Sequence, residues 1–295
     1  MCFDLDGTLT AFSSIVCYLN YIKTVREKRN VSELSYTYNL FRWENTPEEI
    51  ILYAIEKGFE SLGFSDHGFV EHDQRYCMQN TAGYIAEIKR LKAKYADKIE
   101  IYLGAEEDVS YPVKREDFDY IISSYHYIRF RGQYYPFDSN YDYFSTCAEF
   151  FHGDNLAFAK AYYEEFCDYI VKRKPDIIGH FDLVTKFDET RTDRFLHDER
   201  YWEMAENFVK QALNAGSIFE VNTGLITRGF RSMPCPHVRL LKFIAQNGGK
   251  ITLSSDAHCM ENLDAHFKDM KHLLRTIGIS DCYVLKGGVF QKIPL

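Results

Sequence analysis

From about Thr46 onwards, short apolar runs alternate with amphipathic stretches along the chain. This alternation is typical of repeated βα units, in which a helix follows each strand and packs on the sheet. Six strands with interleaved helices predict an α/β barrel whose first strand is altered or incomplete. We expect strands at residues 61–65, 99–103, 120–123, 176–179, 217–221 and 250–254. We expect helices near residues 82–96, 155–173, 200–215, 236–246 and 261–277, some of them with clear helical periodicity.

The start of the first predicted helix suggests where the barrel begins. Thr46-Pro47-Glu48-Glu49 is a capping box with proline at the first helical position, and Gly58 closes the helix that follows. We therefore divide the chain into a divergent N-terminal segment, residues 1–45, and a barrel domain, residues 46–295. Residues 129–153 are rich in Tyr and Phe with little periodicity, which predicts a long loop over the site.

Composition narrows the class of partner. The formal charge is −8 with no long basic run, which argues against nucleic acid and favours a small substrate. The eight cysteines contain no CxxC pair, so we expect reduced thiols and neither a zinc ribbon nor a disulfide framework. The first residues are acidic, unlike a signal peptide, and no segment approaches about 18 uninterrupted apolar residues. These features predict a cytoplasmic protein that does not enter a membrane.

Candidate chemistry gathers where the predicted strands end. The carboxyl ends of the parallel strands of a barrel point to one face, so polar residues just past them converge in space. Histidine with carboxylate is the ligand set for zinc, manganese or iron. Any one such residue has an ordinary structural explanation, but five strand ends that each supply one favour a metal site, because clustered buried charge needs compensation. These positions hold Asp66, His67, Glu106, His126, His180, Asp256 and His258.

The same positions lie in motifs that resemble those of a known family. Five of the motifs occur in the order found in the PHP family, and Glu220-Val221-Asn222-Thr223-Gly224-Leu225, followed by Arg228, resembles a segment of its histidinol-phosphatases. The resemblance runs from about Thr46 to the carboxyl terminus. The five motifs are Gly63-Phe64-Ser65-Asp66-His67, Gly104-Ala105-Glu106, Ser124-Tyr125-His126-Tyr127-Ile128, Ile178-Gly179-His180-Phe181-Asp182 and Ser255-Asp256-Ala257-His258.

The resemblance implies a distorted (βα)7 barrel that holds up to three divalent ions, Zn, Mn or Fe. It implies that Glu106, His126 and His180 bind one ion. Glu106 would bridge to a second ion that Asp256 also binds, which makes these four residues the catalytic set. His67 and His258 would belong to the third ion. Clustered metals would hold the phosphate oxygens and favour ionisation of the attacking water.

Three further polar residues have two interpretations each. Arg228 is a candidate phosphate clamp through its planar fork, or forms an exposed salt bridge. Glu220 and Asp182 are candidates for orienting ligands or the substrate amine, and a capping or structural role is the alternative for both.

The N-terminal segment departs from the family. The family opens with an HxH motif at the end of its first strand, whereas this chain has no His before His67. By spacing the counterpart is Tyr36-Thr37-Tyr38, and tyrosine is a poor divalent-metal ligand at neutral pH because its pKa is near 10. This substitution predicts fewer ions than the family maximum, with lower activity or none.

The first ten residues carry a second resemblance. Phe3-Asp4-Leu5-Asp6-Gly7-Thr8-Leu9-Thr10 resembles the first motif of haloacid-dehalogenase-type phosphatases, in which Asp4 would be the nucleophile and Asp6 the general acid/base. Roughly 40 residues cannot hold the Rossmann-like domain that this family needs. We interpret the motif as a remnant, a fusion scar or a faulty start of the reading frame, with an acidic turn after a short strand as the plain alternative.

The leading hypothesis, implied by the resemblance, is hydrolysis of L-histidinol phosphate to histidinol and phosphate, a step of histidine biosynthesis. A second is a PHP phosphoesterase that acts on another small phosphate ester. A third is a catalytically impaired homologue that binds a metal or phosphate, which the absent HxH motif motivates. Metal content distinguishes the impaired homologue from the enzymes.

Overall fold

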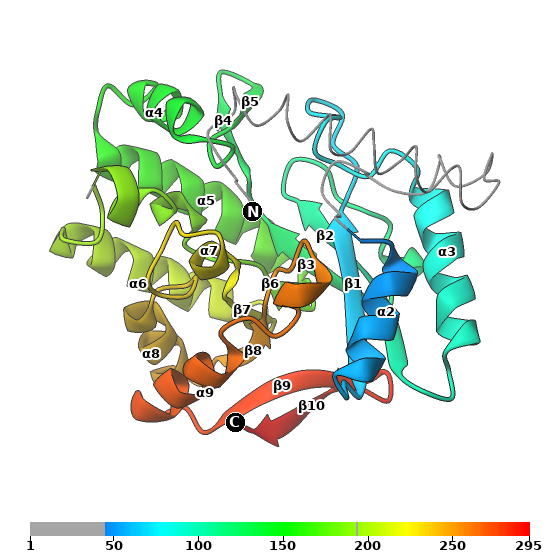
Figure 1. The fold of residues 1–295 in the computed structure, drawn as a ribbon. Coiled ribbons are helices and arrows are strands. Elements are labelled where there is room, and N and C mark those ends of the chain that lie inside the picture. Colours follow the sequence, from blue (N-terminus) through cyan, green and yellow to red (C-terminus); the bar gives the residue numbers. More distant parts are fainter. Residues whose placement is uncertain (1–44, 193) are drawn as a thin grey trace.

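A computed structural model describes residues 45–192 and 194–295 (Figure 1). The motif at Phe3 to Thr10 and the tyrosines at 36 and 38 lie outside the described residues. The division of the chain into residues 1–45 and 46–295 therefore stays a prediction.

A curled sheet of six parallel strands forms the centre of the molecule, in the order β1-β2-β3-β6-β7-β8. All six predicted strands are confirmed. The prediction for β2 stops five residues short, because its last residues include the buried acids Glu106, Glu107 and Asp108. The strands are β1 (Ser61–His67), β2 (Glu100–Asp108), β3 (Tyr120–Ser124), β6 (Ile177–Ile178), β7 (Ile218–Asn222) and β8 (Lys250–Ser254).

Helices cover the outside of this sheet (Figure 1). The capping box that begins the first of them is confirmed: Thr46 Oγ1 accepts from the backbone N–H of Glu49 at 3.2 Å, and the N–H of Thr46 donates to the Glu49 carboxylate at 2.7 Å. The α-helices are α2 (Pro47–Glu56), α3 (Thr81–Lys94), α4 (Tyr141–Glu149), α5 (Asn155–Arg173), α6 (Glu199–Leu213), α7 (Gly224–Thr227), α8 (Val238–Gln246) and α9 (Phe267–Thr276). Short 3₁₀ or π turns are η2 (Arg115–Asp117), η3 (Leu183–Thr185), η4 (Asp188–Thr192) and η5 (Met260–Asn262).

The prediction of a long loop over residues 129–153 is wrong. This segment contains most of an antiparallel hairpin, β4 (Tyr127–Phe130) and β5 (Gln133–Pro136), followed by α4. The hairpin turns through Arg131 and Gly132, both with positive φ, which suits a tight two-residue turn. In α4 the buried Phe144, Cys147 and Ala148 are spaced as on one face of a helix. The other aromatic residues of the segment hide this spacing in the sequence.

A second hairpin closes the amino-terminal end of the sheet. It consists of β9 (Asp281–Lys286) and β10 (Val289–Pro294) and crosses beneath the barrel strands in Figure 1. Leu285 and Phe290 pack against a small apolar cluster at that end of the barrel. Lys286 forms a 2.6 Å ion pair with Glu60, just before β1. The cluster consists of Tyr102, Tyr120, Ile122 and Ile177.

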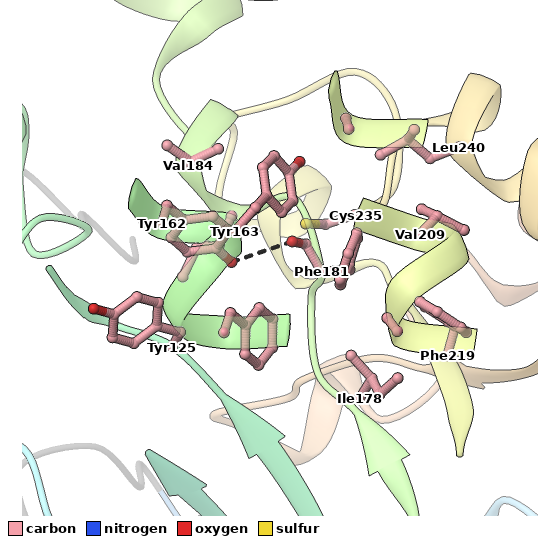
Figure 2. Close-up of a cluster of buried hydrophobic side chains, with 14 of the residues drawn as sticks. Tyr125, Tyr162, Tyr163, Ile178, Phe181, Val184, Val209, Phe219, Cys235 and Leu240 are labelled. Carbon is pink, nitrogen blue, oxygen red and sulfur yellow. Dashed lines mark hydrogen bonds between the residues drawn. The ribbon is translucent and has the colours of Figure 1, made fainter. Parts of the chain in front are cut away.

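The largest core lies between the sheet and helices α5, α6 and α8 and is dominated by aromatic side chains. Figure 2 shows part of it, where the buried Tyr162 hydroxyl donates to the carbonyl of Phe181 at 3.2 Å. Tyr163 and Tyr201 share a hydroxyl–hydroxyl bond of 2.8 Å, so these buried phenols are satisfied. Because Phe181 follows His180 directly, this core fixes the backbone beside a candidate ligand.

Candidate active site

The carboxylate of Glu106, on β2, is the centre of a cluster with three imidazoles. His67 lies at the end of β1, and its Nδ1 is 3.4 Å from Glu106 Oε2. His126 and His180 follow β3 and β6, and their Nε2 atoms lie 3.5 Å and 3.0 Å from Oε1. Residues from four strands therefore meet at the carboxyl end of the sheet, as the sequence predicts.

The cluster has the properties of a cation site. Candidate ligand atoms of His67, Glu106 and His126 all lie within 4.8 Å of one another. Burial raises the pKa of the Glu106 carboxyl, but His67 and its neighbours outweigh burial and hold that pKa well below its usual range. Burial opposes a charge on His180 as well, yet Glu106 raises the pKa of that imidazole to about 9. A buried carboxylate that attracts positive charge this strongly suits a divalent ion.

The donor set itself fits a divalent metal. Three imidazoles and one carboxylate supply the nitrogen and oxygen ligands that zinc and similar ions favour. The Nε2 atom of His180 faces Glu106, while its Nδ1 atom is buried and has no hydrogen-bond partner within the described part of the chain.

Asp108 fixes the orientation of His126. Its Oδ2 accepts from the backbone N–H of His126 at 2.8 Å and lies 3.2 Å from the ring Nδ1. Because Asp108 engages Nδ1, Nε2 points at Glu106, which is the usual relation of a carboxylate to a metal-binding histidine. Asp108 is not among the site residues that the sequence predicts. Residues two apart in a strand point to the same face, which places Asp108 beside Glu106, but the intervening Glu107 hides this relation in the sequence.

A second group of polar residues joins α7 to the segment after β8. Nη2 of Arg228 lies 2.8 Å from Oδ2 of Asp256, and Nη1 lies 3.2 Å from Nδ1 of His258. Burial raises the pKa of the Asp256 carboxyl, but Arg228 and His258 outweigh burial and the net shift is strongly downward. The structure thus brings Asp256, His258 and Arg228 together as one ion-paired group.

Glu220 lies inside the barrel on β7. Its Oε2 accepts from the backbone N–H of His180 at 2.8 Å and from the Asn222 side chain at 3.1 Å. Burial raises the pKa of this carboxyl. Asp182, by contrast, accepts from Arg231 and from the backbone N–H of His237, which supports its structural interpretation.

One cavity of about 290 Å³ connects both polar groups. Five predicted site residues line it, together with Asp66, whose Oδ1 accepts from the backbone N–H of His67 at 2.9 Å. The cavity extends from these polar residues to Leu285 and Phe290 of the C-terminal hairpin. The five residues are His67, Glu106, Glu220, Asp256 and His258.

The PHP domain model matches residues 36–224, more than half of the chain, so this protein belongs to the PHP domain family. Among curated proteins, the chain is 29% identical over 262 residues to a "Probable histidinol-phosphatase" of Schizosaccharomyces pombe, covering 81% of this chain and 84% of that protein. It is 24% identical over 261 residues to the histidinol-phosphatase of Lactococcus lactis, covering 84% and 91%.

A solved structure has a similar fold. It is histidinol phosphate phosphatase from Lactococcus lactis, complexed with Zn, L-histidinol and phosphate. The TM-score is 0.61 at 20% identity, over 84% of this chain and 94% of that chain. The (βα)7-type barrel predicted from sequence is therefore confirmed as the fold. Among the described helices, none has the length and apolar character that crossing a bilayer requires.

Proposed function

We propose that this chain is a metal-dependent phosphomonoesterase that hydrolyses L-histidinol phosphate to L-histidinol and phosphate. The observation that carries the proposal is the cluster of Glu106 with three imidazoles at the carboxyl end of a PHP barrel. Membership of the family and the similarity to proteins named as histidinol-phosphatases support the substrate.

The proposed metal ligands are His67, Glu106, His126 and His180. Zn²⁺, Mn²⁺ and Fe²⁺ all suit imidazole and carboxylate donors, and Zn²⁺ is the ion to test first. When bound, such an ion supplies Lewis-acid stabilisation of the phosphate and favours ionisation of the attacking water. Asp108 keeps the His126 ring turned towards Glu106, so that this ligand does not have to reorient when the ion binds.

The proposed substrate contacts lie in the second polar group and on β7. Arg228, whose guanidinium is held by Asp256 at 2.8 Å, is the proposed phosphate clamp, because a planar guanidinium matches the geometry of phosphate oxygens. Glu220 lines the cavity, where its carboxyl would attract the ammonium group of the substrate. The chain thus offers positive charge to the phosphate end and an acid to the amine end.

Phosphate release by the purified full-length chain, loaded with Zn²⁺ or Mn²⁺, tests this function. We expect turnover of L-histidinol phosphate that His126→Ala abolishes and His272→Ala leaves unchanged, because His272 lies exposed on α9. A panel of other small phosphate esters measures specificity.

The double variant Tyr36→His, Tyr38→His tests the effect of the absent HxH motif. If the parent releases no phosphate and this variant does, the chain is a histidinol-phosphatase that has lost its activity. If neither protein releases phosphate from L-histidinol phosphate, the substrate assignment is contradicted.

A further inference from the structure

Among the described residues, the parallel sheet does not close into a ring. Its strand order ends at β1 on one side and at β8 on the other, and each of these strands is paired along one edge. An edge strand lacks the second row of backbone hydrogen bonds that holds a central strand, so it separates more easily. The cavity lies along this seam, because its lining includes Leu62 and Phe64 of β1 and Leu253 and Ser254 of β8.

Segments that follow β8 cross the seam at both ends of the barrel. At the carboxyl end, Met260 and Leu263 pack against the apolar cluster that α2, β1 and α3 share. The backbone N–H of Met260 also donates to Oδ1 of Asn45, just before α2, at 2.9 Å. At the amino-terminal end the crossing segment is the hairpin of β9 and β10, which lies beneath the barrel strands in Figure 1.

The root of this hairpin is fixed on the β8 side of the seam. Nζ of Lys250, the first residue of β8, lies 5.7 Å from the ring centroid of Tyr283 on β9. Cys282 and Leu295, at the two ends of the hairpin, are buried in the largest core. The N–H of Leu295 donates to the carbonyl of Ser280 at 2.9 Å, which closes the hairpin at its root. The root is therefore part of the packed interior.

The tip of the hairpin is fixed on the other side of the seam by polar contacts. Gly287 and Gly288 form a two-residue turn with φ of +59° and +76°, a conformation that glycine adopts without strain. The N–H of Gly287 donates to the carboxylate of Glu100, the first residue of β2, at 2.9 Å. The N–H of Gly288 donates to the hydroxyl of Tyr102 at 3.1 Å. The turn thus directs two backbone donors at the start of β2.

We propose that the C-terminal hairpin is a strap that holds the seam closed, with its root against β8 and its tip on the amino-terminal ends of β1 and β2. β1 carries His67, and the segment after β8 carries Asp256, so these two residues line the cavity from opposite sides of the seam. A strap that limits the separation of β1 and β8 therefore also limits the width of the cavity. This inference goes beyond the proposed function and does not depend on catalysis.

Hydrogen–deuterium exchange of the full chain, measured by mass spectrometry, tests the strap without any activity measurement. The tip variant Glu100→Ala, Lys286→Met removes the acceptor for Gly287 and the ion pair with Glu60, and it keeps the apolar contacts of the hairpin. We expect about tenfold faster amide exchange in β1 and also in β8, with little change in β3 and β6. The change in β8 is decisive, because neither substituted residue lies on that strand.

Two further variants complete the test. Lys160→Met, Glu164→Gln removes an exposed ion pair within α5 and is the matched control, which should exchange like the parent. Tyr102→Phe removes the acceptor for Gly288 but keeps the ring, and it should accelerate exchange in β1 and β8 by about threefold. Acceleration confined to β1, or none, would overturn the proposal. Equal acceleration in all six strands would overturn it too, because the tip would then contribute only to global stability.

Discussion

At the scale of single residues, the site depends on side chains that hold the proposed ligands in place. Asp108 is buried and touches His126 twice, through the backbone and through the ring. Its effect on catalysis would be indirect, since its proposed role is to orient an imidazole. Such outer residues commonly change metal affinity or activity by roughly tenfold to a hundredfold.

We therefore expect Asp108→Asn to lower both Zn²⁺ affinity and kcat/KM by roughly tenfold to a hundredfold. Asparagine keeps the shape but lacks the charge that favours the correct ring orientation. Competition with a coloured chelator measures the affinity, and Asp269→Asn on the exposed face of α9 is the control. Unchanged zinc affinity in Asp108→Asn would show that His126 needs no orienting carboxylate.

A second residue-scale prediction concerns Gly104 in the interior of β2. A Cβ atom there would lie 2.3 Å from Cζ of Tyr120, whose hydroxyl donates to the carbonyl of Phe64 on β1 at 3.2 Å. We expect Gly104→Ala to lower the free energy of unfolding by about 1–3 kcal/mol, as overpacked cores commonly do. Urea denaturation followed by circular dichroism measures the change, and a midpoint equal to that of the parent would exclude the close packing described here.

Sequence alone predicted the convergence of His67, Glu106, His126 and His180, because each follows or ends a recognisable strand. It could not predict the role of Asp108, because nearly all of β2 is buried and three acids in a row give no polar alternation to follow. It also left the partner of Arg228 open, since a phosphate clamp and a salt bridge have the same sequence signal.

At the scale of elements, β2 is tied to α5 through Glu107. This carboxylate is completely buried, and Arg173 binds it with two N–H groups at 2.9 Å each. Tyr169 and Ser123 donate to the same group at 2.9 Å and 2.6 Å. Because Glu106 and Asp108 flank Glu107, this anchor fixes the strand segment that carries both.

We expect Arg173→Met to destabilise the protein by about 3–5 kcal/mol, because it leaves a buried carboxylate without its cation. Arg115→Met is the matched control: it breaks the exposed pair with Asp176 and should change stability by about 0–1 kcal/mol. Thermal and urea unfolding of both variants give the comparison, and equal losses would mean that burial does not distinguish the two pairs.

Elements outside the βα repeat were the ones that sequence reasoning did not find. The turn at Arg131 and Gly132 is brief, and the strands beside it are aromatic on both faces, so neither strand periodicity nor helix periodicity stands out. By contrast α5, with caps at both ends and an uninterrupted buried stripe, matches its predicted bounds.

At the scale of the whole molecule, the proposed ion joins strands that are far apart in sequence. Ligands from β1, β2 and the ends of β3 and β6 are linked by one cation, so its binding should stabilise the entire barrel. At a free Zn²⁺ concentration one hundred times its Kd, linkage gives about 2.7 kcal/mol.

Removal of metal with a chelator should therefore lower the melting temperature by roughly 5–10 °C, and added Zn²⁺ should restore it. Differential scanning fluorimetry measures the shift. Glu106→Gln should melt at the same temperature with and without Zn²⁺; a shift of the parent's size in that variant would indicate that the stabilising ion lies elsewhere.

The position of β9 and β10 has a consequence for how the protein is made. A ribosome synthesises this hairpin after all six barrel strands, so Tyr102, Tyr120, Ile122 and Ile177 have no cover from Leu285 and Phe290 until those later strands have been made. Exposed apolar surface of this kind makes nascent chains prone to association. A product that terminates before Asp281 would keep every proposed metal ligand but would expose the apolar amino-terminal end of its barrel to water. We therefore expect chaperones and proteases to bind it.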